Sequence, residues 1–364
     1  MRTIFVRLPH APYRICVGRG LAEKLPSLLK GAGLSGKVLV VTERRAASFH
    51  LSRLTRALSK GKVAHQIFFL PEGERAKRPE ELFRIYGFLL KNGFERNDAL
   101  IALGGGAVGD VAGFSAATYL RGIPLVQIGT TLLAQVDSSI GGKTGINLSE
   151  GKNLVGSFYQ PRLVVSDIDL LKTLPRRELV TAFAEVIKYG MIREAGLFHY
   201  LERHLESLLD GDLECLENVV FRSAAIKARI VCRDEKETRG ERMILNYGHT
   251  FGHAFEAASK FRMPHGEAVA LGMVSAARLA VRRGLLSGAE ELRQNRLIER
   301  AGLPTRWRGR RFGIEEVLRP MLLDKKKKGG RLRFVLAEAI GRVRVVEEVP
   351  LSEVRKVLSD LGGN

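Results

Sequence analysis

The first half of the chain alternates between short apolar runs and longer helical patterns, and this alternation restricts the possible folds more than any other feature. Short apolar runs lie at 36–43, 65–74, 98–106 and 123–131, and they end in polar residues, glycines or turns. A helical pattern such as that of residues 78–94 lies between them. Such alternation is typical of a parallel sheet covered by helices.

The strand patterns fade after residue 173, and residues 181–283 have a mainly helical period. We therefore expect an α/β domain over residues 1–173 and a mainly α-helical domain over residues 174–364. A short hairpin is predicted at residues 331–349. A chain of 364 residues is long enough for two domains.

Composition and cysteine content favour a globular protein of the cytoplasm. The 45% hydrophobic and 27% charged residues are typical of soluble domains, and no apolar run is long enough to span a bilayer. The first residues contain no hydrophobic stretch of signal-peptide length. Cys16, Cys215 and Cys232 are odd in number and far apart, which argues against a disulfide framework.

The formal net charge of +20 favours anionic partners, either polyanions or small molecules. The basic run at residues 324–331 would suit a nucleic-acid-binding arm. However, the arginines are scattered along the chain, and no recognition helix or aromatic stacking pattern accompanies them. The charge pattern therefore favours a solvated basic surface over nucleic-acid binding.

The glycine-rich segment GGGAVGD, at residues 104–110, follows a predicted strand and precedes a predicted helix. Glycines allow backbone N–H groups to approach a pyrophosphate, and the N-terminus of a helix favours negative charge. No acidic residue follows about twenty positions later, where a ribose partner is expected in a Rossmann fold. A tight structural turn and an atypical dinucleotide site both remain open.

Further candidate anion-binding segments lie at residues 71–77, 129–147 and 151–153. Lys143 and Lys152 each come after a glycine, where backbone amides and an ammonium group can converge on phosphate oxygens. Solvated loop lysines are the alternative, and the two readings stay open.

A third pattern predicts a metal site. His249 and His253 are four residues apart and so share a helix face, and His265 follows shortly after. Glu185 lies in an otherwise apolar helical stretch, with Lys188 one turn later. Glu185, His249 and His265 together would make a three-ligand zinc site, with His253 left as an acid or a base. An ordinary Glu185–Lys188 ion pair and a histidine pair without metal are the alternatives.

The series of motifs resembles the 3-dehydroquinate synthase family of the sugar phosphate cyclase group, over about residues 13–336. The motifs occur in the order PEGERAK, GGGAVGD, RGIPLVQIGTTLLAQVDSSIGGKTGINLSEGKNLVGSFYQP, LKTLPRRELVTAFAEVIKYG, DEKE, LNYGHTFGHAFE, HGEAVALGM and DKK. The resemblance implies an N-terminal α/β nucleotide-binding domain, a C-terminal helical metal-binding domain and an active site in the cleft between them.

The resemblance also implies a role for each matching position. Glu185, His249 and His265 correspond to the ligands of a zinc or cobalt ion. The positions that correspond to NAD contacts are Glu43, Glu72, Gly73, Glu74, Lys77, Gly105, Gly106, Gly109, Asp110, Thr130, Thr131, Lys143 and Lys152. The positions that correspond to substrate-binding or catalytic residues are Asp137, Lys152, Asn153, Lys188, Lys227, Arg242, Asn246, His253 and Lys326. Arg121 corresponds to an arginine that reaches the neighbouring subunit's site, which implies a homodimer.

The implied reaction converts 3-deoxy-D-arabino-heptulosonate 7-phosphate to 3-dehydroquinate and phosphate in the shikimate pathway of aromatic amino acid biosynthesis. Hydride is transferred transiently to NAD, phosphate is eliminated, the hydride returns, and an intramolecular aldol step closes the ring. The chain departs from the family at VTERRAASFH, where an acidic residue and an asparagine are usual, and at TRGERMILN, which is one residue longer than expected. Another sugar phosphate cyclase and a polyol dehydrogenase of the glycerol dehydrogenase type are the alternatives.

Overall fold

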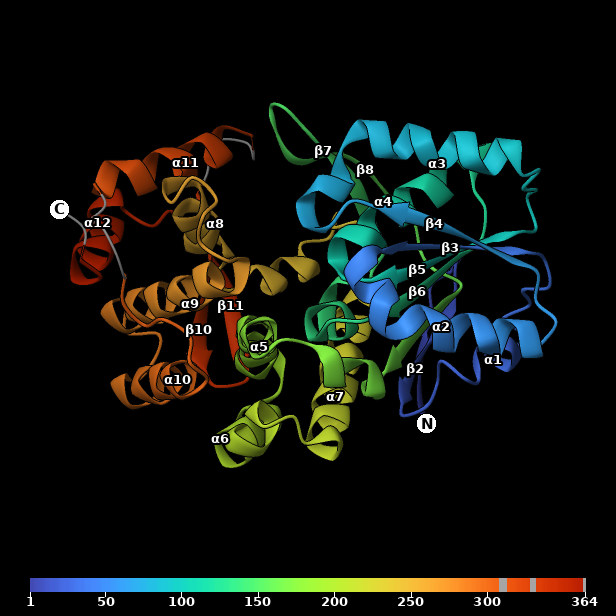
Figure 1. Cartoon of the computed structure of the whole chain (residues 1–364). Helices are drawn as coiled ribbons and strands as arrows, with labels where there is room; N and C mark the ends of the chain where they lie inside the picture. Colours follow the sequence, from blue (N-terminus) through green and yellow to red (C-terminus); the bar gives the residue numbers. More distant parts are fainter. Residues whose placement is uncertain (308–312, 328–331, 363–364) are drawn as a thin grey trace. The chain divides into compact units, whose positions relative to one another are not determined.

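The computed structural model describes residues 1–307, 313–327 and 332–362, with residues 323–327 described by their backbone alone. The chain forms two compact units, each discontinuous in sequence: Met1–Pro175 with Gly211–Lys236, and Arg176–Asp210 with Glu237–Asn364 (Figure 1). Residues 211–236 thus pack with the first unit, although the sequence patterns place them in the second domain. The domain limits 1–173 and 174–364 stay a prediction.

The first unit contains a seven-stranded sheet with the order β1-β2-β9-β6-β5-β3-β4. Its strands are β1 (Arg2–Val6), β2 (Tyr13–Gly18), β3 (Val38–Glu43), β4 (His65–Leu70), β5 (Ala99–Gly104), β6 (Leu125–Gly129) and β9 (Leu163–Asp167). All neighbouring strands are parallel except β1 and β2. The α/β fold and the four predicted strands, here β3 to β6, are confirmed.

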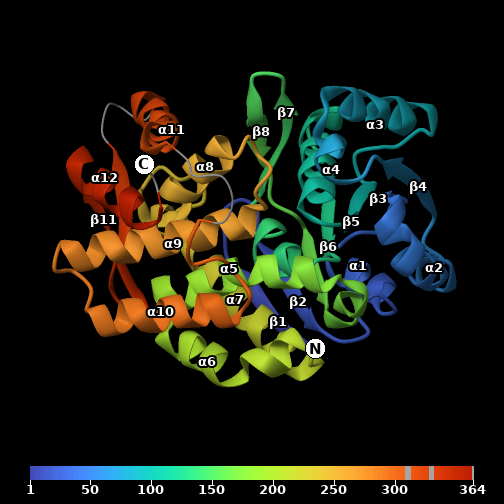
Figure 2. The ribbon, with the colours of Figure 1, turned by 60° about the vertical axis from the view of Figure 1, so that its left-hand side comes forward.

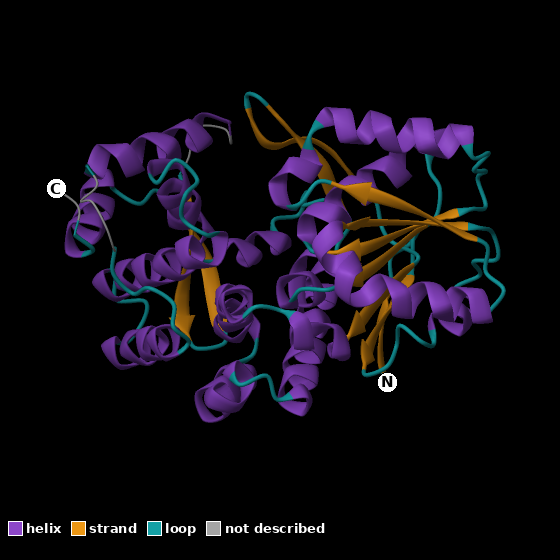
Figure 3. Cartoon of the chain, in the orientation of Figure 1, coloured by secondary structure: helices purple, strands orange, loops and turns teal. Residues whose placement is uncertain are grey.

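Helices cover both faces of this sheet (Figure 3). The helices of the first unit are α1 (Leu25–Gly31), α2 (Arg44–Lys60), α3 (Pro79–Lys91), α4 (Gly106–Thr118) and α7 (Leu213–Arg233). Side chains alternate across a strand, so Leu39 and Val41 of β3 pack in one core cluster with α3 and α4. Val38 and Val40 pack in a second cluster with α1 and α2. Helix α7 packs against β1 and β2.

Short elements complete the first unit. The turns of helix are η1 (Gly73–Lys77), η2 (Tyr119–Arg121), η3 (Ala134–Ser138) and η4 (Ile168–Thr173). Strands β7 (Lys143–Leu148) and β8 (Gly151–Phe158) form an antiparallel hairpin that projects beyond the sheet (Figure 2). The sequence patterns predict anion-binding loops in this segment and do not predict the hairpin.

The second unit is mainly helical. Its elements are α5 (Arg176–Arg193), α6 (Ala195–Leu209), η5 (Glu241–Asn246), α8 (His249–Ala258), α9 (His265–Arg282), α10 (Gly288–Arg300), α11 (Ile314–Lys327), α12 (Leu351–Asp360), β10 (Arg333–Ala339) and β11 (Arg342–Glu347). Strands β10 and β11 form the predicted antiparallel hairpin. Helix α9 packs against α5, α8, α10, α12 and β10. Among the described helices, none combines the length and the apolar character needed to cross a membrane.

Candidate functional site

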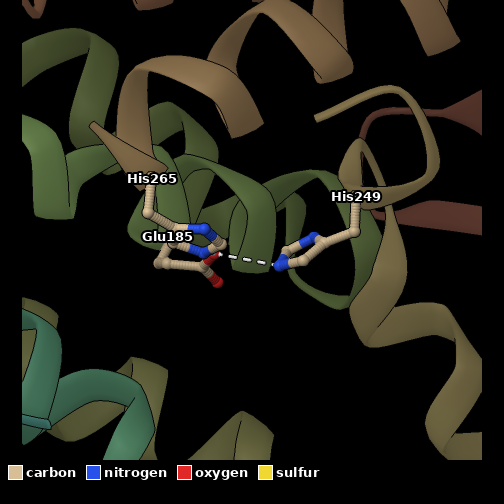
Figure 4. Close-up of side chains that lie close together, drawn as sticks. All are labelled: Glu185, His249 and His265. Carbon is tan, nitrogen blue, oxygen red and sulfur yellow. Dashed lines mark ion pairs between the residues drawn. The ribbon is translucent and has the colours of Figure 1, made fainter. Parts of the chain in front are cut away.

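Three predicted metal ligands come together in the second unit (Figure 4). Glu185 lies in α5, His249 begins α8 and His265 begins α9. Oε1 of Glu185 is 3.4 Å from Nε2 of His249 and 3.7 Å from Nε2 of His265. One ligand atom of each residue lies within 4.8 Å of the others, which is the spacing that a single ion requires.

Glycines allow the three helices to approach one another closely enough for this arrangement. A Cβ atom at Gly266, next to His265, would lie 1.9 Å from the backbone oxygen of Thr181 in α5. A Cβ atom at Gly272 of α9 would lie 1.9 Å from the backbone oxygen of Gly248, next to His249. Any larger residue at either position would push α9 away from its neighbour and separate the ligands.

The two imidazole rings are oriented by hydrogen-bonding contacts at their other nitrogen. Nδ1 of His249 lies 3.3 Å from the backbone oxygen of Tyr247, and Nδ1 of His265 lies 3.3 Å from Oε1 of Glu256. Such partners fix the ring orientation of metal-binding histidines, leaving Nε2 to face the ion. Sequence reasoning missed Glu256, although it lies seven residues after His249 on the same helix.

The carboxylate of Glu185 fits a cation. The residue is only 2% exposed, and neither carboxylate oxygen accepts a hydrogen bond from the described residues. Its Oε2 forms an ion pair with the ammonium group of Lys188, as one of the alternative readings expected. Burying a carboxylate with so few donors is costly, and a bound cation would compensate for the lost hydration.

The electrostatics keep this carboxylate charged and one imidazole neutral. Burial raises the pKa of Glu185, but the ammonium group of Lys188 and the two histidines outweigh burial and hold the pKa well below its usual range. Burial and Lys188 lower the pKa of His249 well below its usual value, so this ring is neutral, as a metal ligand must be. Burial lowers the pKa of His265, but the neighbouring carboxylates of Glu185 and Glu256 raise it to about 10.

Four residues that are predicted to bind substrate or take part in catalysis also lie in the second unit. The ring of His253 is 5.3 Å from that of His249 and 6.3 Å from that of His265, between centroids. Arg242, in η5, is only 1% exposed and forms an ion pair of 3.3 Å with Glu237. Asn246 ends η5. Lys326 lies in α11, but its side chain falls outside the described residues.

The glycine-rich segment forms the turn between β5 and α4 in the first unit. Gly105 is the N-cap of α4, and since it has no side chain it cannot itself cap the N-terminal N–H groups of this helix. The backbone N–H of Thr130 donates to the Gly104 oxygen at 3.0 Å, and the Thr131 hydroxyl accepts from the Ala134 N–H at 3.1 Å. Uncapped N–H groups beside this turn would suit a pyrophosphate.

A carboxylate lies beside this turn in space, although the sequence has no acidic residue at the expected position about twenty residues after it. Strands β3 and β5 are parallel, with Thr42 paired to Leu103, so Glu43 follows next to Gly104. The carboxylate of Glu43 accepts a hydrogen bond of 3.1 Å from the Gly73 N–H. A carboxylate at the end of a neighbouring strand is where a dinucleotide fold binds ribose.

A cavity of about 550 Å³ lies next to the hairpin in the first unit. Among its lining residues are five predicted site residues, namely Asp110, Asp137, Lys143, Asn153 and Lys227. The ammonium group of Lys227 lies 2.9 Å from the Asp137 carboxylate and donates to the Asp137 backbone oxygen at 2.8 Å. Burial raises the pKa of Asp110, and the ammonium group of Lys77, 2.6 Å away, opposes this rise.

The remaining predicted residues lie at the edges of this region of the first unit. Glu72 precedes η1, Glu74 lies within it, and Gly109 lies in α4 against the side chain of Gln127. Lys152 is exposed on β8. Arg121 is exposed and has a φ angle of 66°, between Leu120 and Gly122, whose φ angles are also positive.

Comparison with known proteins identifies the family. The models of the N-terminal and C-terminal parts of 3-dehydroquinate synthase match residues 67–181 and 182–327. The 3-dehydroquinate synthase of Gloeobacter violaceus is 47% identical over 364 residues, which is 100% of both chains. That of Desulforamulus reducens is 44% identical over 360 residues, which is 99% of this chain and 100% of its own.

Solved structures of other enzymes have the same fold as this chain. The 2-epi-5-epi-valiolone synthase from Streptomyces hygroscopicus, with NAD+ and Zn2+ bound, is 29% identical with a TM-score of 0.89 over 98% of both chains. A 2-deoxy-scyllo-inosose synthase with carbaglucose-6-phosphate, NAD+ and Co2+ is 25% identical with a TM-score of 0.88, over 99% of this chain and 100% of its own. A probable glycerol dehydrogenase from Sinorhizobium meliloti, 17% identical with a TM-score of 0.64 over 96% of both chains, shares the fold. The ordered motifs, the fold and the two full-length relatives agree: the chain belongs to the 3-dehydroquinate synthase family.

Proposed function

We propose that this protein is an NAD- and metal-dependent 3-dehydroquinate synthase, a carbon–oxygen lyase that releases phosphate from 3-deoxy-D-arabino-heptulosonate 7-phosphate. The observation that carries the proposal is the cluster of Glu185, His249 and His265 in a chain that aligns with these synthases over its full length. The solved cyclases with bound NAD+ and Zn2+ or Co2+ support the same pair of cofactors.

The residues of this chain fit both cofactors. Glu185, His249 and His265 would hold the zinc or cobalt ion, and the turn at Gly105 and Gly106 would hold the pyrophosphate of NAD. When bound, the metal supplies a Lewis acid for a substrate hydroxyl and NAD supplies a reversible hydride acceptor.

Three basic side chains are held in place before the anionic substrate arrives. Lys188 is paired with Glu185, Lys227 with Asp137, and Arg242 with Glu237. Because these partners already restrict the side chains, less conformational entropy is lost when a carboxylate or phosphate binds them. Fixed cations of this kind would orient the substrate and stabilise the charge on the departing phosphate.

His253 is suited to hold or move a proton beside the metal ligands, because its ring lies next to both histidines without being one of the three ligands. The proposed set of substrate contacts is completed by Asp137, Lys152, Asn153, Asn246 and Lys326. We assign the protein to the cytoplasm as a homodimer in which Arg121 reaches the partner's site. Two observations support these assignments: its three cysteines, all within the described residues, form no disulfide, and Arg121 is exposed.

The decisive experiment measures phosphate release from the heptulosonate phosphate, with and without a chelator, while NADH absorbance is recorded. The synthase releases phosphate with no net NADH, and the chelator abolishes the release. Steady accumulation of NADH from a polyol would instead identify a dehydrogenase of the glycerol dehydrogenase type. Phosphate release only from heptulose phosphates without a carboxylate would identify another cyclase.

A further inference from the structure

The β7–β8 hairpin contains an irregularity that places two predicted site residues. Ile146 pairs with Val155 and Leu148 pairs with Gly151, so Asn147 alone lies opposite residues 152–154. Lys152 and Asn153 therefore lie in a bulge of β8. Bulges leave backbone groups without a partner in the ladder and often redirect side chains next to active sites.

The side chain of Asn147 supplies the missing partner. Its Oδ1 accepts a hydrogen bond of 3.0 Å from the Asn153 N–H, and its Nδ2 donates a hydrogen bond of 2.6 Å to Oε2 of Glu74 in η1. Asn153 has a φ angle of 56°, in the left-handed region that asparagine tolerates better than most residues. Residues 152–156 are all exposed, so packing contributes little to fixing this conformation.

The conformation of Asn153 in turn determines the surroundings of Lys77. The ammonium group of Lys77, a residue only 3% exposed, donates to Oδ2 of Asp110 at 2.6 Å and also to Oδ1 of Asn153. A chain of contacts thus runs from Glu74 through Asn147 and Asn153 to Lys77 and Asp110. Glu74, Lys77 and Asp110 are proposed NAD contacts, whereas Asn153 is a proposed substrate contact.

We propose that Asn147 is a positioning residue that couples the cofactor side of the site to its substrate side. It holds Asn153 in the left-handed conformation and ties the hairpin to η1, so that Asn153 and Asp110 together orient the ammonium group of Lys77. The inference rests on the proposed function, because it concerns the affinity of this region for NAD and for the heptulosonate phosphate.

The first test compares NAD binding by calorimetry in the wild type, Asn147→Ala and Ser149→Ala. Loss of the Asn147 amide should weaken NAD binding about tenfold, because Lys77 loses a fixed acceptor and the Asn153 N–H loses its partner. The metal content of the second unit should not change. Ser149 is the control because it is exposed on the same hairpin and its hydroxyl bonds only to neighbouring Glu150 among the described residues. NAD affinity in Ser149→Ala should stay within about twofold of the wild type.

The second test exchanges the donor and the acceptor. Asn147→Asp places a second carboxylate against that of Glu74, and the two negative charges repel each other. This variant should therefore weaken NAD binding, and raise the KM for the heptulosonate phosphate, more than Asn147→Ala does. Adding Glu74→Gln to Asn147→Asp restores the hydrogen bond with the roles reversed, because the new glutamine amide can donate to the new carboxylate. The double variant should therefore bind NAD at least about fivefold more tightly than the sum of the two single effects on the binding free energy would predict. A purely structural hairpin residue would change the melting temperature without this coupling.

Unchanged NAD affinity in Asn147→Ala, or additive effects in the double variant, would overturn the inference and leave the proposed function intact. A wild-type protein that binds no NAD would overturn both together.

Discussion

Glu185 supplies the carboxylate of the candidate metal centre, and its substitution tests that centre most directly. Glu185→Gln keeps the size of the side chain but removes its charge, so zinc affinity should fall more than about 100-fold. NAD affinity should be unchanged, because the glycine-rich turn belongs to the other compact unit. Elemental analysis after dialysis measures the zinc, and Glu178→Gln, exposed on the same helix, is the matched control. A full complement of zinc in Glu185→Gln would refute the ligand assignment.

Glu256 should act on the metal through His265, whose Nδ1 it contacts. Glu256→Gln should weaken zinc binding about 10–100-fold, because the ring loses the carboxylate that orients it and makes it more basic. Competition with a chromogenic chelator measures this affinity.

His253→Ala should instead retain zinc and lose turnover. Loss of zinc in His253→Ala would show that the histidine roles are assigned wrongly.

For single residues, the sequence was enough to predict the candidate site residues but not the hydrogen-bonding contacts between their side chains. The histidines of residues 249–265, together with a glutamate in an apolar stretch, predicted a metal site of Glu185, His249 and His265, and the structure brings these three residues together. The contact of Glu256 with His265 depends on how α8 meets α9, and the bond from Asn147 to Asn153 depends on a bulge. Both are products of tertiary packing and register, which local patterns do not encode.

Helix α10 begins with a cap whose removal should be measurable. The Ser287 hydroxyl oxygen accepts from the Glu290 N–H at 3.2 Å, and the hydroxyl donates to the Glu290 carboxylate at 2.8 Å. Ser287→Ala should lower the free energy of unfolding by about 1 kcal/mol, whereas Ser287→Thr should keep most of the cap. Denaturant unfolding of the three proteins makes the comparison. Equal midpoints for Ser287→Ala and the wild type would show that the cap contributes nothing.

The turn after β9 should make stability depend on pH. Asp169 is largely buried, but its bonds to Lys172 and to the Gly20 N–H hold its pKa below the usual value. A carboxyl whose pKa is lowered by folding stabilises the native state above its unfolded pKa, about 3.9, and this contribution is lost as the pH falls through the folded pKa.

Asp169→Asn should therefore melt at a lower temperature than the wild type at pH 7, and the difference should shrink below about pH 4. Asp210→Asn is the control, because Asp210 is exposed and its pair with Arg176 spans 3.6 Å. A difference that stayed constant with pH would contradict the assigned role of the carboxylate.

Whether an element could be predicted depended on its burial. Strands β3, β5 and β6 are buried along almost their whole length, and such burial selects continuous apolar runs. The edge strand β4 has only two buried residues, and it was predicted from a short apolar run that ends in a turn. Strand β8 is largely exposed and contains Gly151 and Gly156, so it carries neither a buried run nor a regular alternation. Strand β1 is a short antiparallel edge, for which the sequence signal is equally weak.

The proposed homodimer leads to a prediction for the whole molecule. If Arg121 completes the site of the partner subunit, neither Arg121→Ala nor His249→Ala should be active alone. In a mixed dimer, the Arg121→Ala subunit receives an intact arginine from its partner, so mixing the two after dissociation should restore about a quarter of wild-type activity. Turnover of the reassociated mixture measures this recovery. Two inactive variants that stay inactive when mixed would argue for a site built from a single chain.

The discontinuous first unit has a consequence for how the protein is made. Strands β1 and β2 leave the ribosome before the other strands of their sheet, but α7, which packs against them, ends only at Arg233. Helices α5 and α6, which belong to the second unit, are synthesised in between. The nascent chain must therefore keep part of its first sheet uncovered while it produces a segment of the other unit, and exposed apolar surface of this kind makes a folding intermediate prone to aggregate.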